Sequence, residues 1–290
     1  MRHAILGAGG IGGLVAASLA RAGLPIVLLL RPHSLADYSG RIAVESVVLG
    51  NFESEVPAAS TLDREIDVLW VATKATQLER ALGLAPPDRI GAEATLIPLL
   101  NGIDHVDLLR ASYPTVVAGA IRVESERLTS GRIRQSSPFL RVDLAGAEPA
   151  ASDLRASGID CRISDDELTL LWEKLAFLAP VALATTALDA PLGAVRDDER
   201  FQGCQREALA VAHAEGAHVN EAGLRAVLEA APAEMRSSMQ KDVDAGHPPE
   251  LDAIAGPILR GGQRHQLPTP HTKELSRLVE ARTNAASPIG

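Results

Sequence analysis

Short apolar runs alternate with helical patterns along the first half of the chain. Residues 4–6 form an apolar run that ends in a cluster of glycines, and apolar residues at 11–19 then recur with the spacing of one helical face. Further apolar runs at 26–30, 67–72 and 94–99 have the length of buried strands. Strands that alternate with helices are typical of a parallel, doubly wound sheet. The first half is therefore predicted to be an α/β domain.

Two segments of this half have a different pattern, and the pattern changes again near residue 165. Residues 41–48 and 116–124 resemble pieces of a hairpin or meander, which predicts an antiparallel portion appended to the parallel sheet. Beyond residue 165 the apolar positions have helical periodicity and form no convincing strand. We predict an N-terminal α/β domain at 1–164 and an all-helical domain at 165–290, with the active site between them.

The same periodicity bounds the helices of the second half. The acidic residues 165–167 are typical of a helix start, and Pro180 is expected to kink or interrupt the helix that follows. Residues 283–290 are expected to form a frayed tail. Further helices are predicted at 198–215, 221–230, 249–265 and 272–281.

Charge and cysteine content narrow the classes of function. The 290 residues carry a net charge of -9, whereas a general nucleic-acid binder needs a surplus of Lys and Arg on one face. Cys161 and Cys204 have neither disulfide-like nor zinc-like spacing, and the eight histidines have no metal-like spacing, so no metal site is predicted. Neither a signal peptide nor a membrane span is indicated, and we expect a cytoplasmic protein.

The glycine cluster has the spacing of a dinucleotide-binding turn. Residues 7–12 read Gly-Ala-Gly-Gly-Ile-Gly between the first apolar run and the first helical pattern. Gly7 permits the tight turn, Gly9 lets the backbone approach a pyrophosphate, and Gly12 permits close packing of helix on strand. Gly10 and Ile11 would offer backbone N–H groups at the helix start to the phosphates. This context predicts a Rossmann-type domain that binds a nicotinamide dinucleotide.

The residue after the second predicted strand indicates which dinucleotide. NAD sites use Asp or Glu at this position to accept hydrogen bonds from the ribose 2′-hydroxyl. This chain has Arg31 there and no carboxylate, and an arginine can pair with a 2′-phosphate. We therefore predict NADPH as the cofactor.

Three further positions could supply the polar groups of a carbonyl reductase. Lys74 follows the third buried strand and Asn101 follows the fourth, at the strand ends where doubly wound sheets bind ligands. Lys174 lies in the first helix of the second half, where partial burial could lower its pKa. The chain has only four lysines, so lysine is not its general-purpose cation.

Taken together, these residues resemble the ketopantoate reductase family, over almost the whole chain. The family reduces 2-dehydropantoate to pantoate with NADPH in pantothenate biosynthesis. The resemblance implies the Rossmann-type domain and a C-terminal helical domain with 6-phosphogluconate-dehydrogenase-like architecture. It rests on the glycine turn, Arg31, Lys74-Ala75-Thr76-Gln77, Asn101-Gly102, Trp172-Glu173-Lys174-Leu175, Ser237-Ser238-Met239-Gln240-Lys241-Asp242, Gly246-His247-Pro248-Pro249-Glu250-Leu251 and Leu267-Pro268-Thr269-Pro270.

The resemblance also implies roles for single residues. Lys174 would be the general acid that protonates the developing alkoxide, and Glu250 would orient or assist at the hydroxyl end. Asn101 would bind substrate or nicotinamide, and Ser238 would hold the substrate carboxylate. Lys74 would lie near the cofactor ribose.

The chain departs from the family in the helix that carries Lys174. The family presents asparagines one and two turns after this lysine, where this chain has Leu178 and Ala182. Residues at i+4 and i+8 share a face with the lysine, so the change bears on substrate recognition. The resemblance then implies reduction of a small-molecule 2-oxo acid to a 2-hydroxy acid. The substrate is either 2-dehydropantoate or a related, more apolar compound.

Two other interpretations stay open at the level of sequence. An opine- or 3-hydroxyacid-type dehydrogenase also joins a Rossmann domain to a helical domain, although its lysine and asparagine context fits this chain less well. A non-enzymatic NADP(H)-binding redox sensor is the second, and Lys174 and Glu250 in a lysine-poor chain speak against it. Apolar helices in the second half also suggest a homodimer.

Overall fold

The computed structural model describes residues 1–62 and 64–286, and the chain divides into two compact units. The first unit comprises Met1–Leu100 and His105–Leu170, and the second comprises Asn101–Asp104 and Leu171–Gly290. The short segment Asn101–Asp104 thus belongs to the second unit, although its neighbours in sequence belong to the first. The domain boundary between residues 164 and 165 stays a prediction.

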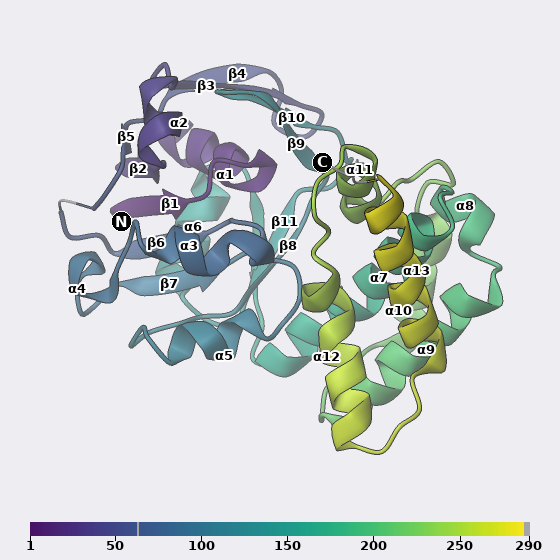
Figure 1. Ribbon diagram of the computed structural model, residues 1–290. Helices are drawn as coiled ribbons and strands as arrows, with labels where there is room; N and C mark the ends of the chain where they lie inside the picture. The colour runs from purple at the N-terminus through teal and green to yellow at the C-terminus, as the bar shows by residue number, and fades with distance from the viewer. Residues whose placement is uncertain (63, 287–290) are drawn as a thin grey trace. The chain divides into compact units, whose positions relative to one another are not determined.

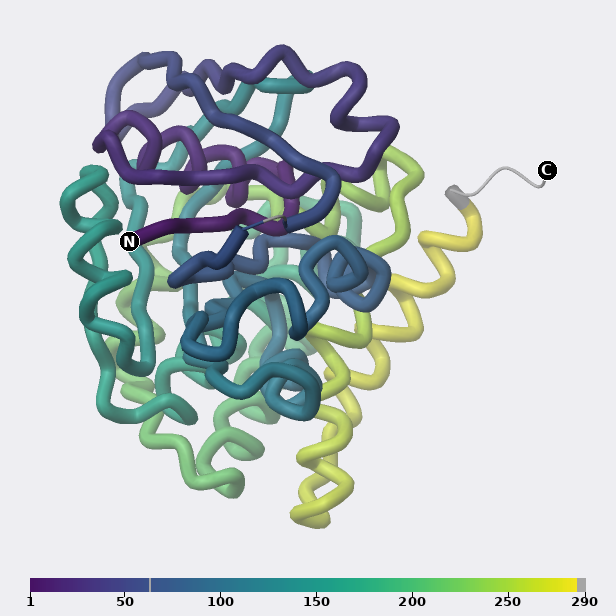
Figure 2. Tube along the Cα trace, turned by 90° about the vertical axis from the view of Figure 1, so that its left-hand side faces the viewer, coloured from purple at the N-terminus to yellow at the C-terminus, as the bar shows by residue number. Residues whose placement is uncertain are grey.

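The first unit is built on a parallel sheet in the order β5-β2-β1-β6-β7 (Figure 1). Figure 2 shows the trace of the chain turned by 90° from this view. The apolar runs predict four of its strands to within one or two residues. The central pair, β1 and β6, is buried along its whole length. In sheet order the strands are Ala58–Ala59, Ile26–Leu29, His3–Leu6, Val68–Val71 and Thr95–Pro98.

Two smaller mixed sheets accompany the parallel sheet. One has the order β4-β3-β10-β9 and contains two antiparallel pairs, β3 with β4 and β9 with β10. The other has the order β12-β11-β8, with β8 antiparallel to β11. The predicted antiparallel portion is therefore confirmed. These strands are Arg41–Ser46 (β3), Phe52–Glu55 (β4), Gly119–Arg122 (β8), Ser125–Thr129 (β9), Arg132–Gln135 (β10), Arg141–Leu144 (β11) and Asp160–Ile163 (β12).

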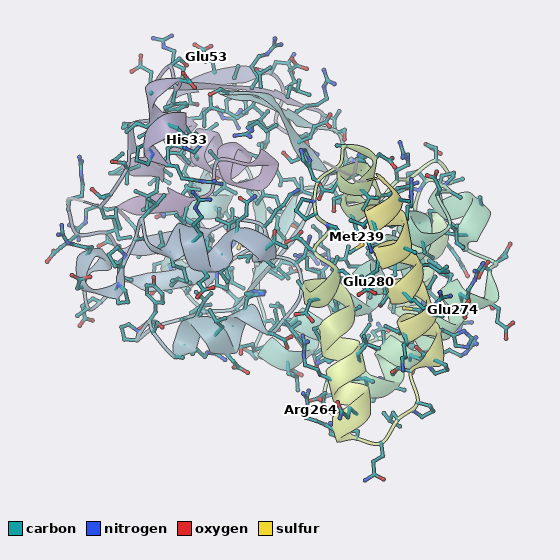
Figure 3. The ribbon with its side chains drawn as sticks, in the orientation of Figure 1. His33, Glu53, Met239, Arg264, Glu274 and Glu280 are labelled. Atoms are coloured by element: carbon teal, nitrogen blue, oxygen red, sulfur yellow. The ribbon has the colours of Figure 1, made fainter. Side chains whose placement is uncertain are left out.

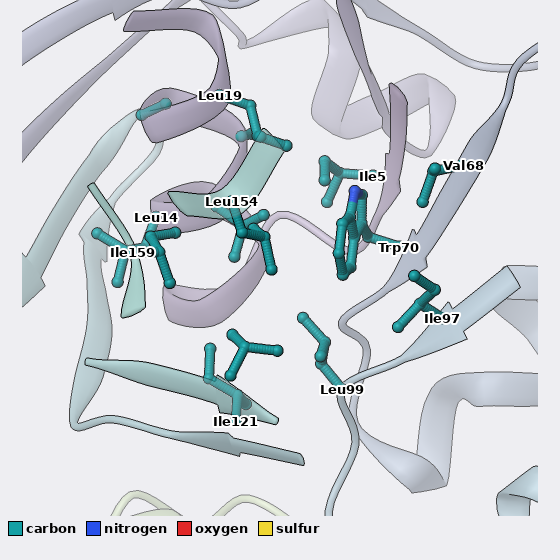
Figure 4. Close-up of a cluster of buried hydrophobic side chains, with 14 of the residues drawn as sticks. Ile5, Leu14, Leu19, Val68, Trp70, Ile97, Leu99, Ile121, Leu154 and Ile159 are labelled. Carbon is teal, nitrogen blue, oxygen red and sulfur yellow. The ribbon is translucent and has the colours of Figure 1, made fainter. Parts of the chain in front are cut away.

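Two helices of this unit, α1 and α6, contribute buried side chains to one apolar core with the strands. Figure 4 shows buried side chains of β1, α1, β6, β7, β8 and α6 in one cluster, with Trp70 among them. The helices of the unit are Gly10–Arg21 (α1), Pro32–Ala36 (α2), Leu78–Leu82 (α3), Pro87–Ile90 (α4), His105–Arg110 (α5) and Glu148–Ala156 (α6), with a 3₁₀ turn (η1) at Ala75–Gln77.

The second unit is helical over the residues that the structure describes, as predicted. The four later helices expected from periodicity correspond to α9, α10, α12 and α13. Two short helices, α8 and α11, were not predicted because one or two turns leave little periodicity to detect. The helices are Glu167–Ala187 (α7), Leu192–Val195 (α8), Glu199–Ala214 (α9), Glu221–Ala230 (α10), Ser238–Asp244 (α11), Leu251–Arg264 (α12) and Pro270–Ala286 (α13).

Two expectations for these helices are corrected by the structure. Pro180 does not interrupt α7, which continues from Glu167 to Ala187, whereas a kink at this residue stays a prediction. Proline removes one backbone hydrogen bond, but the helix is buried on both sides of it and packing holds it together. The frayed tail is wrong over 283–286, because α13 continues to Ala286. Residues 287–290 of the predicted tail lie outside the described residues.

Helix α7 is also long and apolar enough to cross a membrane by length and composition. Within its most apolar window, however, 67% of the residues are buried inside the protein. The second apolar core forms around it and includes Trp172, Leu175 and Ala182. We therefore interpret α7 as the central core helix of the second unit.

Candidate active site

The glycine turn after β1 has the close contacts that its sequence predicts. Gly7 has a φ of +112°, and a Cβ atom there would lie 2.7 Å from the carbonyl oxygen of Ala72, just after β6. A Cβ atom at Gly12 would lie 1.8 Å from the carbonyl oxygen of Gly7. Both positions therefore require glycine, since a side chain would push the helix away from the strands.

Space remains at the position where a pyrophosphate would bind. A Cβ atom at Gly9 would meet nothing within 4 Å, and helix α1 begins at Gly10 with no side-chain cap. The buried hydroxyl oxygen of Thr73, next to the turn, has no hydrogen-bond partner among the described residues. An open cradle at a helix start beside an unsatisfied hydroxyl fits the diphosphate of a dinucleotide. Thr73 was missed at the sequence level, because a lone threonine after a strand has no distinctive pattern.

Two cations lie at the carboxyl ends of β2 and β6, the two strands that flank β1. Arg31 follows β2, is half-buried, and donates from Nη2 to Oε1 of Gln77 at 3.1 Å. Lys74 follows β6, is also half-buried, and directly precedes the 3₁₀ turn that carries Gln77. The parallel sheet thus brings Arg31, Lys74 and the glycine turn to one edge, as the strand order predicts.

The predicted catalytic lysine lies in the second unit, on α7. Lys174 is half-buried, as is Leu178 one turn later, while Ala182 a further turn along is fully buried. Since α7 is continuous through these positions, the three residues share one face of the helix. Over these two turns, that face contains one cationic group followed by apolar side chains.

A carboxylate and an amide meet elsewhere in the second unit. Glu250 directly precedes α12 and is 9% exposed. Asn101 donates from Nδ2 to Oε2 of Glu250 at 3.3 Å. These two residues are 149 positions apart in sequence, and the structure brings them together through the segment Asn101–Asp104. Such a pair can accept and donate hydrogen bonds at a substrate hydroxyl.

The serine predicted to bind a carboxylate lies beside a second, buried serine. Ser238 is exposed and is the first residue of α11. Ser237 caps that helix by accepting from the backbone N–H of Gln240, and its hydroxyl lies 2.8 Å from that of Thr185 on α7. The capping role of Ser237 could have been recognised from the Ser-x-x-Gln spacing. This contact fixes the start of α11 against the helix that carries Lys174.

The two cysteines are both free, as their spacing suggested, and the structure shows that both are buried. Burial raises the pKa of each thiol to about 12, so neither Cys161 nor Cys204 is a thiolate near neutral pH. No group of three or more metal-ligating side chains comes together within residues 1–62 and 64–286. The candidate chemistry therefore rests on the lysine, carboxylate and amide groups described above.

Comparison with protein families agrees with this division into two parts. The model described as "Ketopantoate reductase PanE/ApbA" matches residues 3–144, and "Ketopantoate reductase PanE/ApbA C terminal" matches residues 167–283. The chain belongs to the ketopantoate reductase family. It is accordingly an oxidoreductase that acts on the CH–OH/C=O pair, and the family is a pyridine-nucleotide-dependent group of 2-oxo acid reductases.

Individual relatives of the ketopantoate reductase family match along the whole chain. The 2-dehydropantoate 2-reductase of Mycobacterium tuberculosis (strain ATCC 25618 / H37Rv) is 30% identical over 293 residues, which cover 96% of each protein. The PanE/ApbA family ketopantoate reductase from Ralstonia eutropha JMP134 superposes with a TM-score of 0.88 at 25% identity, over 99% of both chains. A D-mandelate dehydrogenase structure with NADH and anilino(oxo)acetate gives the same TM-score at 22% identity over 99% of both chains, which shows a shared fold.

Proposed function

We propose that this chain reduces a 2-oxo acid to the 2-hydroxy acid with NADPH, and that the substrate is 2-dehydropantoate or a related, more apolar 2-oxo acid. The observation that carries this proposal is the face of α7 on which Lys174 is followed by Leu178 and Ala182. A partly buried lysine on an otherwise apolar face suits protonation of a carbonyl oxygen. The apolar part of this face offers few hydrogen bonds to a heavily hydroxylated substrate.

The cofactor assignment is supported by the residues at the end of β2. Arg31 stands where an NAD site carries a carboxylate, and a guanidinium pairs well with a 2′-phosphate. Gly9, Gly10, Ile11 and Lys74 complete the proposed cofactor contacts at this edge of the sheet. Bound NADPH supplies the hydride to the carbonyl carbon.

Side chains of the protein would carry out the proton transfer and hold the substrate in place. As the carbonyl carbon gains the hydride, the ammonium of Lys174 gives a proton to the carbonyl oxygen, which becomes the new hydroxyl. Glu250 accepts a hydrogen bond from that hydroxyl and, with Asn101, orients it. Ser238, at the start of α11, donates to the substrate carboxylate.

The substrate preference follows from what Leu178 and Ala182 can do. Neither side chain forms hydrogen bonds, so two amide contacts of the family pattern are lost. Each such bond is worth about 1 kcal/mol. In exchange, Leu178 offers apolar contact area, which favours a 2-oxo acid with a bulkier hydrocarbon group. The D-mandelate dehydrogenase with the same fold holds NADH and anilino(oxo)acetate, so the fold itself decides neither cofactor nor substrate.

The experiment is NADPH oxidation by the purified protein with 2-dehydropantoate and a panel of bulkier aliphatic and aryl 2-oxo acids. We expect at least one compound to reach a kcat/KM of about 10⁴ M⁻¹s⁻¹ or more. A faster reaction with an apolar analogue than with 2-dehydropantoate would identify the substrate class. Absence of turnover across the panel would contradict the proposal.

The Lys174→Ala variant is the control for this panel. It should lower kcat by about 10²–10⁴-fold while leaving the Kd for NADPH within about twofold, because an acid catalyst acts in the chemical step. A Lys174→Ala protein as fast as the parent would remove the catalytic assignment. The homodimer and the cytoplasmic location expected from the sequence stay predictions.

A further inference from the structure

The hairpin of β9 and β10 lies directly against the glycine turn of the first unit. A Cβ atom at Gly10 would lie 2.2 Å from the carbonyl oxygen of Ser125, so only glycine allows the strand to approach this closely. The hydroxyl of Ser125 donates to the carbonyl oxygen of Gly10 at 2.9 Å. These contacts fix the hairpin beside the turn.

A cavity opens beside this contact, between the glycine turn, the end of β2 and the hairpin. It is a small hollow, partly open to solvent, and its lining includes Ala8, Leu30, Ser34, Arg127 and Ser130. The wall from β2 is apolar, whereas Ser34 of α2 and Arg127 of β9 add a hydroxyl and a guanidinium to the lining. This combination of groups suits a compact anion attached to a less polar body.

Arg127 is the unpaired cation of the hairpin. Its Nη1 donates to the carbonyl oxygen of Ala8 at 3.4 Å, and within the described residues no carboxylate pairs with it. The two arginines of the adjacent strand behave differently, because Arg132 and Arg134 both bond to Glu45. A guanidinium without a counter-ion, held against a phosphate-binding turn, is placed to bind an anionic ligand.

The position of the cavity indicates which anion. In dinucleotide-binding domains the adenosine ribose lies between the glycine turn and the end of the second strand, with its 2′ group toward that strand. The cavity joins these two elements through Ala8 and Leu30. Arg31, in contrast, bonds to Gln77 after β6 and does not line the cavity.

We propose that Arg127 and Ser34 bind the 2′-phosphate of NADPH at this cavity, together with Arg31 at the end of β2, and thereby strengthen the preference for NADPH over NADH. Arg127 forms charge-assisted hydrogen bonds to the phosphate oxygens, and Ser34 donates its hydroxyl. A 2′-hydroxyl carries no charge, so NADH gains little from either side chain. The inference rests on the proposed NADPH dependence and adds a residue from the β9–β10 hairpin to it.

The test is calorimetric titration of the full chain with NADPH and with NADH. We expect Arg127→Gln to raise the Kd for NADPH at least tenfold and the Kd for NADH less than twofold. Ser34→Ala should have the same selectivity with a smaller effect. Arg132→Gln is the matched control, because its side chain is exposed and paired with Glu45, and it should leave both Kd values unchanged.

The outcomes separate this inference from the proposed cofactor. A parent protein that binds NADPH no more tightly than NADH would overturn both. A parent preference for NADPH that survives Arg127→Gln unchanged would overturn this inference alone. An equal loss of NADPH and NADH binding in Arg127→Gln would also overturn it, since it would assign Arg127 to the diphosphate shared by both cofactors.

Discussion

At the residue scale, His3 is a buried histidine whose protonation state is set by its neighbours. It is 1% exposed, its Nδ1 accepts from the indole Nε1 of Trp70 at 3.1 Å, and its Nε2 lies 2.9 Å from Oδ2 of Asp153. An indole N–H can only donate, so Nδ1 must be unprotonated and Nε2 must carry the proton. Burial lowers the pKa of His3 below its ordinary value of 6.5, and the bond to Asp153 only partly opposes this.

This lowered pKa predicts that acid weakens the first unit. Below about pH 6.5 the unfolded chain binds a proton at His3 that the folded chain does not bind. The free energy of unfolding therefore decreases as the pH is lowered, until the pH reaches the pKa of His3 in the folded protein. The loss is about 1.4 kcal/mol for each unit by which folding lowers the pKa. Urea unfolding between pH 7.5 and pH 5.5 measures it.

Two variants test the source of this pH dependence. In His3→Gln the fall attributed to His3 should disappear, because glutamine does not titrate. His33→Gln, which removes an exposed histidine of the same unit, is the matched control. If His3→Gln and the parent have the same slope, the buried histidine is not the cause.

At the scale of elements, one helix of the second unit caps another. Glu207 on α9 is buried and accepts from the backbone N–H groups of His271 and Thr272, both at 2.8 Å. Its Oε2 also accepts from the hydroxyl of Thr272 at 2.6 Å. The first turn of α13 therefore has its N–H groups satisfied by a carboxylate from a distant part of the chain.

We predict that Glu207→Gln lowers the free energy of unfolding by about 1–3 kcal/mol. An amide has one acceptor oxygen and no charge, so at least one buried N–H loses a charge-assisted partner. Glu274→Gln, which changes an exposed residue of α13 (Figure 3), should change the free energy of unfolding by less than about 0.5 kcal/mol. Denaturant unfolding of the three proteins decides this, and equal stabilities would contradict the capping role.

Contacts with distant residues at both ends of α13 explain why its predicted bounds were wrong. Periodicity predicts a helix at 272–281, but the helix runs from Pro270 to Ala286. Proline in the first turn and the cap from Glu207 extend its start. At its end, Arg282 donates to the carbonyl oxygen of Thr186 at 2.6 Å and to Asp189 and Asp244 at 2.5 Å each. All these partners are remote in sequence, so a local pattern could not reveal them.

At the scale of the whole molecule, the four residues Asn101–Asp104 belong to the second unit, although the residues before and after them in sequence belong to the first. Within Asn101–Asp104, Gly102 has a φ of +84°, and a Cβ atom there would lie 2.3 Å from the carbonyl oxygen of Ala253 on α12. Asp104 forms an ion pair with Arg260 of the same helix. These contacts hold Asn101 against Glu250.

Gly102→Ala should therefore reduce both stability and activity. The positive φ and the backbone overlap together cost about 2 kcal/mol or more. Displacement of Asn101 from Glu250 should lower kcat/KM for the active 2-oxo acid at least tenfold. Gly246→Ala is the matched control, because Gly246 has a φ of +71° and no atom within 4 Å of an added Cβ. If both variants lose activity equally, the contact with α12 is not responsible.

Much of the fold and part of the candidate site were predictable because they depend on local features. Four strands of the parallel sheet follow from short apolar runs, and the glycine turn follows from its spacing and its place between strand and helix. Parallel strands align their carboxyl ends, so the grouping of Arg31 and Lys74 near that turn was also expected. The apolar face after Lys174 follows from helical periodicity alone.

Other features depend on contacts between residues that are far apart in the chain. The pairing of Asn101 with Glu250, the approach of Ser125 and Arg127 to the glycine turn, and the cap that Glu207 provides are of this kind. By itself, then, the sequence determined the class of each element and the residue types available for chemistry, because backbone periodicity and turn geometry are local. Only the tertiary structure decided which of these side chains meet, because packing brings together residues whose separation along the chain carries no record of their contact.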